Sequence, residues 1–365
     1  MNILHVINNL VPAGAERLLV DIAKEQQALG EHVEVLAYMP AGSSLERELA
    51  DAGITLHTGR FGHLYNPLNA FAGRKAIRRA DVIHVHLFPA QYWVAAARRL
   101  FRPKAAVVTT EHSTFNARCR YRLTTWTDRM AYRCYDAASC ISPAVVDFMR
   151  ERTKGRLPLR LIENGINVRR FASAKAERSQ LLPGVPEHSF LLMQVALFRE
   201  QKNQDCVIRA LTHLPSDVHA VFVGDGERRA ECQRLAGSLG VSGRTHFLGS
   251  RSDVPQLLSL ADVVVMSSHW EGFGLAAVEG MAAGKPVLAS RVEGLAAVVG
   301  REELLFIPDD DLQLSKKVLS LRADSETYVR AADYCRARAA AYDIANTSKK
   351  LIKFYADTIK GEVER

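Results

Sequence analysis

The chain has 365 residues, of which 48% are hydrophobic and 24% charged, and its formal net charge is +8. It is too long for one ordinary hydrophobic core and suits two domains. No apolar stretch reaches the ~20 residues that a membrane-spanning helix needs. The six cysteines contain no Cys-x-x-Cys pair, so neither a zinc site nor a disulfide framework is indicated, and we predict a cytoplasmic protein.

Positive charge is concentrated in the first half of the chain. Residues 1–168 carry 22 lysines and arginines against 15 acidic residues, which accounts for +7 of the total of +8. Such asymmetry indicates an anionic partner, either a membrane surface or a phosphorylated acceptor. The first of these would place the protein peripherally at the inner membrane face. The alternative is a set of solvated helix faces that keep the protein soluble. No nucleic-acid-binding module is visible, so nucleic acid is not an expected partner.

The first half alternates apolar runs with amphipathic stretches, which is typical of a doubly wound parallel sheet. Strands are predicted at 2–7, 32–37, 54–57, 82–86, 105–110, 137–141 and 159–162. Helices are predicted at 14–29, 44–52, 67–79, 89–101, 120–135 and 143–152. Ser142 and Pro143 mark the start of the last of these helices, as N-cap and first-turn residue.

A segment without periodicity, residues 172–188, is predicted to be a linker, after which the alternation resumes. Strands are predicted near 190–196, 218–223, 244–248, 262–266, 286–289 and 304–307. Helices are predicted near 202–213, 227–239, 252–259, 275–283, 293–299, 312–320, 325–341 and 344–360. We expect an N-terminal domain of residues 1–170, joined by the C-terminal helix 344–365, and a second domain of residues 171–343.

The stretch Glu271–Glu279 places two carboxylates around a Gly-x-Gly turn, between a β-branched apolar run and an Ala-rich segment. The order is therefore strand, loop, helix. A helix start offers unpaired N–H groups that suit a phosphate, and a carboxylate can accept hydrogen bonds from a ribose. The structural alternative is an ordinary connection between strand and helix with surface carboxylates.

This stretch resembles the signature of the retaining family-4 glycosyltransferases of the GT-B fold. The resemblance implies two Rossmann-like doubly wound parallel-sheet domains that face a cleft. It implies that Glu279 holds the ribose of a sugar nucleotide. It also implies that the amides near Gly274, Leu275 and Ala276 hold the diphosphate, and that Glu271 lies near the donor sugar.

Two positions in the first half match the same family. Gly14 stands at the start of a helix, in a loop similar to the family's Gly-Gly-Ala-Glu loop, although Ala13 replaces the first glycine. His112 follows the strand at 105–110, where a family histidine contacts the donor sugar, with Ser113 and Asn116 as candidate neighbours. A lone histidine is more often structural. His84 and His86 alternate on one strand, and we interpret them as structural or cleft-lining residues, not metal ligands.

In the second half, Lys202 matches the family's lysine that neutralises the leaving diphosphate. Leu197 stands where the family has an arginine, and this departure puts full donor activation in question. Arg199 could substitute for it if the two residues lie on one strand, because residues i and i+2 share a face. Gly249 follows the strand predicted near 244–248, where the family reads the nucleobase with backbone groups.

We therefore predict a retaining glycosyltransferase that moves a sugar from a nucleotide-diphosphate sugar, a UDP-sugar before a GDP-sugar, to a hydroxyl group. The expected acceptor is a glycan or lipid-linked glycan in surface polysaccharide or glycoconjugate assembly. The expected catalytic residues are Glu271, His112, Lys202 and Arg199. No Asp-x-Asp motif is present, so nothing in the sequence requires a metal. Two alternatives remain, a GT-B sugar-nucleotide epimerase and a non-catalytic sugar-nucleotide-binding subunit.

Overall fold

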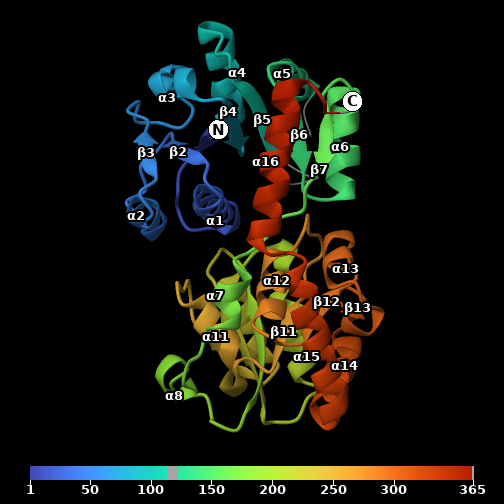
Figure 1. Ribbon diagram of the computed structural model, residues 1–365. Helices are drawn as coiled ribbons and strands as arrows, with labels where there is room; N and C mark the ends of the chain where they lie inside the picture. Colours follow the sequence, from blue (N-terminus) through green and yellow to red (C-terminus); the bar gives the residue numbers. More distant parts are fainter. Residues whose placement is uncertain (113–121, 364–365) are drawn as a thin grey trace. The chain divides into compact units, whose positions relative to one another are not determined.

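The computed structural model describes residues 1–112 and 122–363, with the backbone alone at 122–124. The chain forms two compact units (Figure 1). Unit 1 contains Met1–Gly165 and Ile344–Arg365, and unit 2 contains Ile166–Asp343. The chain thus leaves unit 1 after Gly165 and returns to it through its last helix. Within the described residues, no helix is long and apolar enough to span a membrane.

Unit 1 is built on a parallel sheet whose described strands follow the order β3-β2-β1-β4-β5-β6-β7. The strands are β1 (Asn2–Ile7), β2 (His32–Ala37), β3 (Thr55–Thr58), β4 (Val82–His86), β5 (Ala106–Glu111), β6 (Ala137–Cys140) and β7 (Leu159–Leu161). The chain builds from β1 towards β3 and then crosses to β4 on the other side. The loops after β1 and β4 therefore diverge at a topological switch point, where open α/β sheets bind ligands.

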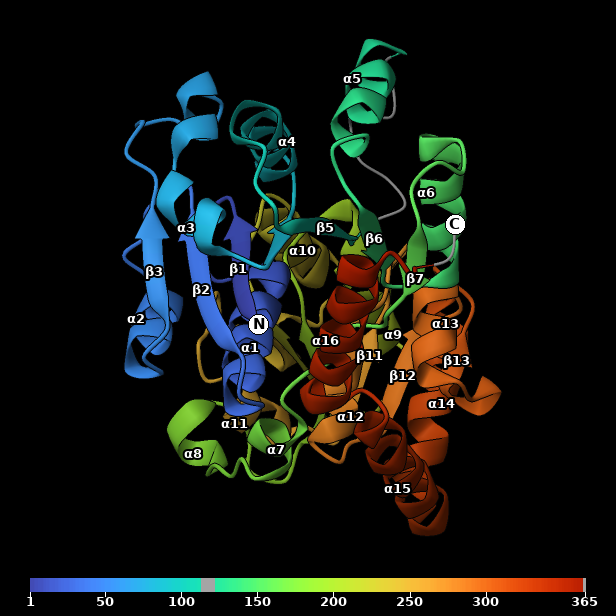
Figure 2. The same ribbon diagram turned by 45° about the horizontal axis from the view of Figure 1, so that its top comes forward.

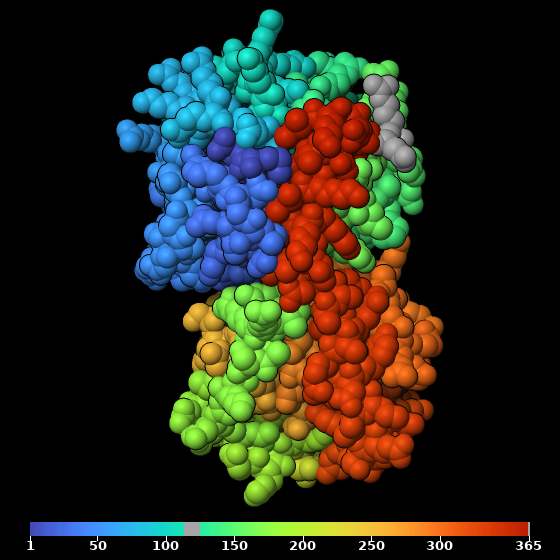
Figure 3. Space-filling model, in the orientation of Figure 1, coloured from blue at the N-terminus to red at the C-terminus, as the bar shows by residue number. Residues whose placement is uncertain are grey.

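The helices of unit 1 cover the sheet. They are α1 (Gly14–Ala28), α2 (Ser44–Asp51), the 3-10 helix η1 (Pro67–Phe71), α3 (Arg74–Arg79), α4 (Ala90–Phe101), α5 (Arg122–Tyr132), α6 (Pro143–Thr153) and α16 (Ile344–Lys360). Helix α16 packs against α1 and β5 (Figures 2 and 3). Its Phe354 and Tyr355 are fully buried in a core cluster with Ile3 and Val108. The C-terminal helix is therefore part of the core of unit 1.

Unit 2 repeats the architecture on a smaller scale, with described strands in the order β10-β9-β8-β11-β12-β13, all parallel. The strands are β8 (Phe190–Val195), β9 (Val218–Val223), β10 (Thr245–Phe247), β11 (Val263–Met266), β12 (Val287–Ser290) and β13 (Leu305–Phe306). Here the order reverses between β8 and β11. The loops that follow these two strands are the switch point of unit 2.

The helices of unit 2 alternate with its strands. They are α7 (Val168–Ala172), α8 (Arg178–Leu181), η3 (Glu200–Lys202), α9 (Gln204–Leu211), α10 (Arg229–Ser238), η4 (Ser242–Arg244), α11 (Val254–Leu260), α12 (Leu275–Ala282), α13 (Glu293–Val299), η5 (Glu302–Leu304), α14 (Asp311–Ala323) and α15 (Ser325–Ala340). Most strands of the two sheets are largely apolar and buried, as expected for parallel strands that are covered on both faces, whereas the edge strands β3 and β7 of unit 1 are partly exposed.

Two predictions about local structure are wrong. The helix predicted at 67–79 is two helices, because Gly73 adopts φ +64° and interrupts it between η1 and α3. The linker predicted at 172–188 contains α8, and Arg178 fixes the following loop by donating hydrogen bonds to the carbonyls of Glu187 and Ser189, at 2.6 and 2.7 Å. One arginine thus orders a segment that lacks any periodic apolar pattern. The Ser142 cap is confirmed, since its Oγ accepts a hydrogen bond from the Val145 N–H.

Candidate active site

The candidate site of unit 2 lies at the carboxyl ends of its parallel strands. Lys202 follows β8, Gly249 follows β10, and Glu271 and Gly274 follow β11. Because β8 and β11 are neighbours in the sheet, the loops that carry Lys202 and Glu271 start side by side at the switch point. The topology therefore brings together residues that are far apart in the sequence.

The centre of this site is an ion pair between Lys202 Nζ and Glu271 Oε1. The Glu271 side chain is only 9% exposed and that of Lys202 is 20% exposed. Ser268 Oγ donates a second hydrogen bond to Glu271 Oε1, at 2.9 Å. The carboxylate thus has two donors from the protein, which fixes its position beside the ammonium group.

The loop that carries Glu271 is held by two glycines. Gly274 adopts φ +96°, and a Cβ atom there would lie 2.4 Å from Leu295 Cδ2. Gly294, in the first turn of α13, lies so close to this loop that its Cβ would come within 2.4 Å of the Glu271 carbonyl oxygen. Helix α13 therefore packs directly on the Glu271–Gly274 loop, and any larger residue at either glycine would displace it.

Helix α12 begins immediately after Gly274, with Leu275 and Ala276 as its first residues. Its N-cap residue provides no side-chain hydrogen bond to the first turn. The amides of a helix start without a side-chain cap can serve an anion, aided by the helix dipole. Glu279 is the fifth residue of α12, one turn after this start and only partly exposed.

A network of hydrogen bonds braces the ends of the Lys202 and Glu271 loops. His269 donates its backbone N–H to the Gln201 carbonyl (2.8 Å), and Asn203 Nδ2 donates to Asp309 Oδ1 (2.8 Å). The ring of His269 lies between the Glu200 carbonyl, 3.0 Å from Nδ1, and Asp309 Oδ1, 3.0 Å from Nε2. Both partners are acceptors, so both bonds form together only when the ring carries two protons. The hydrogen bond from His269 lowers the pKa of Asp309.

The geometric argument for Arg199 as a substitute for Leu197 is not supported. Strand β8 ends at Val195, so neither Leu197 nor Arg199 lies on a strand and the i, i+2 rule does not apply. Both side chains are exposed in the loop before η3, where Arg199 is the N-cap residue. A functional role for Arg199 therefore depends on the reach of a flexible exposed side chain.

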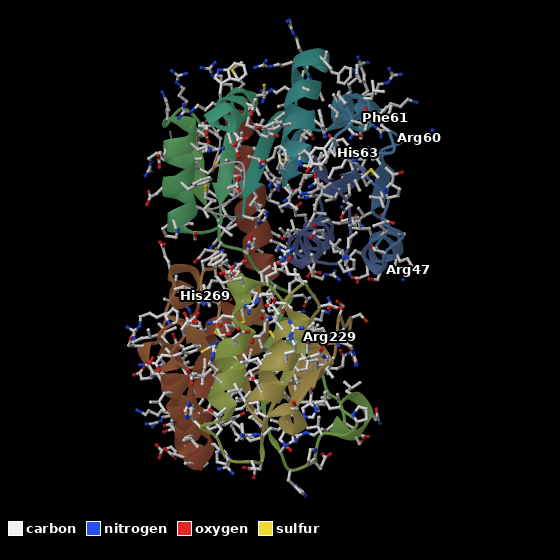
Figure 4. All side chains as sticks on the ribbon, turned by 180° about the vertical axis from the view of Figure 1, so that it is seen from behind. Arg47, Arg60, Phe61, His63, Arg229 and His269 are labelled. Atoms are coloured by element: carbon white, nitrogen blue, oxygen red, sulfur yellow. The ribbon has the colours of Figure 1, made fainter. Side chains whose placement is uncertain are left out.

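Gly249 belongs to a second part of the same edge. Its carbonyl accepts a hydrogen bond from the Gly224 N–H (2.8 Å), which joins the loops after β9 and β10. Arg229 lies beside it and donates from Nη2 to the Phe247 carbonyl at 3.2 Å. Figure 4 labels Arg229 and His269, which lie towards the same end of unit 2.

Gly14 of unit 1 is the first residue of α1 and follows β1. The N-cap residue Ala13 is extended and gives the helix no side-chain hydrogen bond. The nearby loops are joined by Asn8, whose Nδ2 donates to the Phe88 carbonyl (2.7 Å) and whose Oδ1 accepts from the Ala90 N–H (3.0 Å). The helix start is therefore an uncapped set of amides at the switch point of unit 1.

His112 follows β5, and its Nε2 is buried without a hydrogen-bond partner among the described residues. Burial lowers the pKa of His112 to about 4, so the imidazole is neutral at neutral pH. A buried polar atom without a partner is costly and often marks a ligand position. The candidate neighbours Ser113 and Asn116 lie outside the described residues.

A cluster of buried histidines lies behind His112, and it contains His5, His84 and His86. His5 Nε2 faces Gln26 Oε1 (2.8 Å), and its Nδ1 faces His86 Nε2 (3.1 Å). The two nitrogens of His84 face the Tyr355 hydroxyl (2.6 Å) and Thr110 Oγ1 (2.7 Å). Neutral imidazoles satisfy all of these contacts, which supports a structural role over metal binding.

The structure thus brings six of the predicted residues to one edge of unit 2: Lys202, Glu271, Gly274, Leu275, Ala276 and Glu279. Gly249 follows β10, which is two strands away from β8. Gly14 and His112 belong to unit 1. Sequence reasoning missed His269 and Asp309. Both act through contacts that no local pattern of residues encodes.

The chain has two parallel-sheet units, each with a topological switch point of the kind at which ligands bind. This is the GT-B fold, which is the architecture of many glycosyltransferases. Residues 12–170 match the family model of Glycosyltransferase Family 4, and residues 180–338 match that of Glycosyl transferases group 1. Between them the matches leave out only the two ends of the chain and residues 171–179. The chain belongs to the group 1 glycosyltransferases of family 4 and is therefore a transferase of class EC 2.4.

Curated relatives of similar length support this assignment. The chain is 25% identical over 300 residues to N-acetyl-alpha-D-glucosaminyl L-malate synthase of Bacillus anthracis, covering 78% of this chain and 75% of that protein. It is 26% identical over 332 residues to the lipopolysaccharide core biosynthesis glycosyltransferase LpsD of Rhizobium meliloti, covering 89% of both.

Solved structures show the same fold. Anabaena HepE, crystallised with UDP-glucose, superposes with a TM-score of 0.83 at 24% identity, covering 98% of this chain and all of that chain. WaaG, a glycosyltransferase involved in lipopolysaccharide biosynthesis, superposes with a TM-score of 0.73 at 21% identity, covering 98% of this chain and all of that chain.

Proposed function

We propose that the protein transfers a sugar, with retention of anomeric configuration, from a UDP-sugar to a hydroxyl group of a glycan or lipid-linked glycan. The observation that carries this proposal is the Lys202–Glu271 ion pair at the switch point of unit 2, next to the uncapped start of α12. Together, the ion pair and the helix start supply a cation, a carboxylate and backbone amides at one place. These are the groups that a sugar diphosphate requires.

Each residue has a separate proposed role. In unit 2, Lys202 and the amides of Leu275 and Ala276 stabilise the diphosphate as it leaves, and Arg199 adds a second positive charge. Glu279 accepts hydrogen bonds from the ribose, and the backbone at Gly249 contacts the base. Glu271 positions the donor sugar. In unit 1, Gly14 contributes amides to the diphosphate and His112 contributes a neutral imidazole to the sugar, for which its Nε2, unpartnered among the described residues, is suited.

The choice of UDP is supported by HepE, whose structure was determined with UDP-glucose. The choice of a surface glycan as acceptor is supported by LpsD and WaaG, whose names connect them with lipopolysaccharide synthesis. At 21–26% identity, none of these three proteins is similar enough to transfer a substrate directly. The donor sugar and its carrier therefore have to be found by a screen.

The decisive experiment incubates the pure protein with a panel of UDP- and GDP-sugars, with and without a bacterial membrane extract. We expect release of UDP that depends on the extract, and a product with the anomeric configuration of the donor by NMR. Turnover without any acceptor would indicate an epimerase. Binding of donor without turnover in any extract would indicate a non-catalytic subunit, and inverted configuration would contradict the retaining mechanism.

We also propose that unit 1 associates with an anionic membrane surface through one exposed apolar and basic face. Five of the large exposed apolar side chains of unit 1 lie on η1, on the end of α4, on α5 and in the loop before η1: Tyr65, Leu68, Phe71, Leu100 and Trp126. Basic residues of α3, α4 and α5 accompany them. Helix α4 packs against η1, α3 and α5, and these helices lie at the upper end of unit 1 in Figure 1.

The composition of this face suits a membrane interface. Phe71 and Phe101 pack edge to face with ring centroids 5.6 Å apart, and the Arg78 guanidinium lies 6.0 Å from the Phe101 ring. Aromatic side chains favour the interface between water and lipid, and each nearby lysine or arginine adds about 1 kcal/mol of attraction to anionic lipids. A lipid-linked acceptor would be presented at such a surface.

Vesicle flotation tests this association. We expect binding to vesicles that contain phosphatidylglycerol but not to phosphatidylcholine vesicles, and loss of binding at high salt. Leu100→Ser and Trp126→Ser should weaken it, whereas Val329→Ser, an equally exposed apolar position in unit 2, should not. Binding that is indifferent to lipid charge would refute the proposal.

A further inference from the structure

Unit 2 contains a cavity of about 600 Å³ that is separate from the candidate active site. It lies between α14 and α15 at the β13 edge of the sheet, where segment 301–304 leads into the amino end of β13. The active-site residues lie at the carboxyl ends of the strands instead. Helices α14 and α15 are adjacent in Figure 1. The volume is within the usual range of small-molecule sites, roughly 300–1,000 Å³.

The floor of the cavity is apolar. It is lined by Leu288 of β12, Leu304 of η5 and Leu321 of α14, and Ala331 of α15 closes one side. All four side chains are buried. An apolar or aromatic body could therefore rest on this floor and lose contact with water, which is the main source of affinity in such sites.

The rim of the cavity is cationic. Four positive side chains line it, from three different segments: Arg301, Lys316, Lys317 and Arg330. The lining contains one carboxylate, that of Glu303, which is 78% exposed and lies 3.6 Å from Arg301. Arg330 also forms an exposed ion pair with Glu326, at 3.8 Å, so the rim keeps an excess of positive charge and favours anions.

Two of these cations form no ion pair with the residues that the structure describes, although the charges of Glu302 and Glu303 act on Lys317. Within residues 1–112 and 122–363, no carboxylate lies within ion-pair distance of Lys316 or Lys317. Lys317 Nζ donates instead to the Glu303 carbonyl at 2.7 Å, which holds the ammonium at the cavity. Arg301 lies over the Tyr334 ring, 4.5 Å from its centroid, so its position is also restrained. Lys317 and Arg301 are thus held in place, and restrained cations suit an anion because less side-chain entropy is lost when it binds.

We propose that this cavity is a second ligand site, for a small amphipathic anion with an apolar or aromatic body and a phosphate group. The body rests on the leucine floor, and the phosphate is held by Lys316, Lys317 and Arg330 at the rim. The assignment rests on the shape and charge of the cavity and is independent of the proposed donor and acceptor.

A matched pair of probes tests the site by calorimetry. 1-Naphthyl phosphate should bind at least about tenfold more tightly than 1-naphthol, which has the same aromatic body without the charge. Lys316→Glu and Arg330→Glu, at exposed positions, should abolish this difference. Ser320→Trp, which places a ring in the cavity, should block both probes. Lys349→Glu makes the same charge change on an exposed lysine of unit 1 and should have no effect.

Binding at the active site is distinguished with Lys202→Ala. If that variant loses 1-naphthyl phosphate while Lys316→Glu keeps it, the probe binds at the proposed donor site and the second site does not exist. Equal affinity for the two probes, or no binding of either, would also overturn the proposal. Circular dichroism of each variant checks that it is folded, and Ser320→Trp remains an independent test if a charge reversal unfolds the protein.

Discussion

Lys202 and Glu271 are separated by 68 residues in the sequence, yet Lys202 Nζ is in contact with Glu271 Oε1. The resemblance to family 4 assigns them to different parts of the donor, one to the diphosphate and the other to the sugar. In the structure each is the counter-ion of the other. The ion pair therefore sets the position of both side chains, and its two members should not behave independently when they are mutated.

The first prediction concerns this pair. Lys202→Ala should lower kcat/KM by about 10²–10³, because it removes a positive charge from the leaving diphosphate and also frees Glu271. Glu271→Gln keeps the shape of the side chain and should lower kcat more than it raises KM. A double-mutant cycle on Lys202→Ala and Glu271→Ala should give a coupling energy of about 1–3 kcal/mol in urea unfolding. A coupling near zero would mean that the pair does not form in solution.

The second prediction concerns Arg199. If Arg199 supplies the charge that Leu197 lacks, Arg199→Ala should lower kcat/KM by at least tenfold, or about 1.4 kcal/mol. Leu197→Arg should then restore activity to the Arg199→Ala variant. Steady-state rates with the donor found in the screen provide the measurement. An intact rate in Arg199→Ala, with activity lost in Lys202→Ala, would show that Arg199 has no such role.

The third prediction concerns the loop of Glu271. Gly274→Ala should destabilise the protein by about 1–3 kcal/mol, because alanine is strained at φ +96° and its Cβ would meet Leu295. Gly243→Ala is the matched control in unit 2, since a Cβ there meets nothing within 4 Å and its φ is not positive; it should change stability by less than about 0.5 kcal/mol. Equal urea midpoints for the two variants would contradict the packing of α13 on this loop.

The fourth prediction concerns Asp309, which accepts hydrogen bonds from both Asn203 and His269. Asp309→Asn should lower kcat with little change in stability, because the brace behind Lys202 loses its charged acceptor. The ¹⁵N NMR signals of the His269 ring should shift, because the ring loses its carboxylate partner. Asp333→Asn, which removes an exposed carboxylate paired with Arg336, is the control and should change neither property. Unchanged His269 signals would contradict the brace.

The fifth prediction concerns the buried histidines of unit 1. Burial lowers the pKa of His5 to about 4 and holds the pKa values of His84 and His86 well below the usual value. Their unfolded pKa is about 6.5, so the unfolded chain binds more protons than the folded one below that pH. The stabilisation is complete above about pH 6.5 and is lost as the pH falls below it, by roughly 1–2 kcal/mol per histidine at about pH 5.

Hydrogen exchange resolved by peptide checks this pH dependence. Protection of β1 and β4, which carry these histidines, should decrease between about pH 7 and pH 5 after correction for the intrinsic exchange rate. Strands β11 and β12 of unit 2 contain no histidine and serve as the internal control. The same loss of protection in both pairs of strands would show that the histidine cluster is not responsible.

Most of the fold could be predicted from the sequence, because parallel strands buried on both faces are unbroken apolar runs. Strands β1, β2, β4 and β9 have the predicted bounds. The errors fell where one residue overrides a pattern. Gly73 divides a helix that the apolar periodicity predicts as continuous, and Arg178 orders a segment that has no periodicity at all.

The sequence by itself determined the class of protein, because strand, glycine turn and helix recur in an order that the family shares. It also determined which residues carry suitable chemical groups, such as Lys202, Glu271 and His112. Only the tertiary structure decided which groups meet. The order of the strands makes β8 and β11 neighbours, and this joins Lys202 to Glu271. Contacts such as those between His269 and Asp309 depend on how the loops after different strands meet, and no local pattern of residues encodes that.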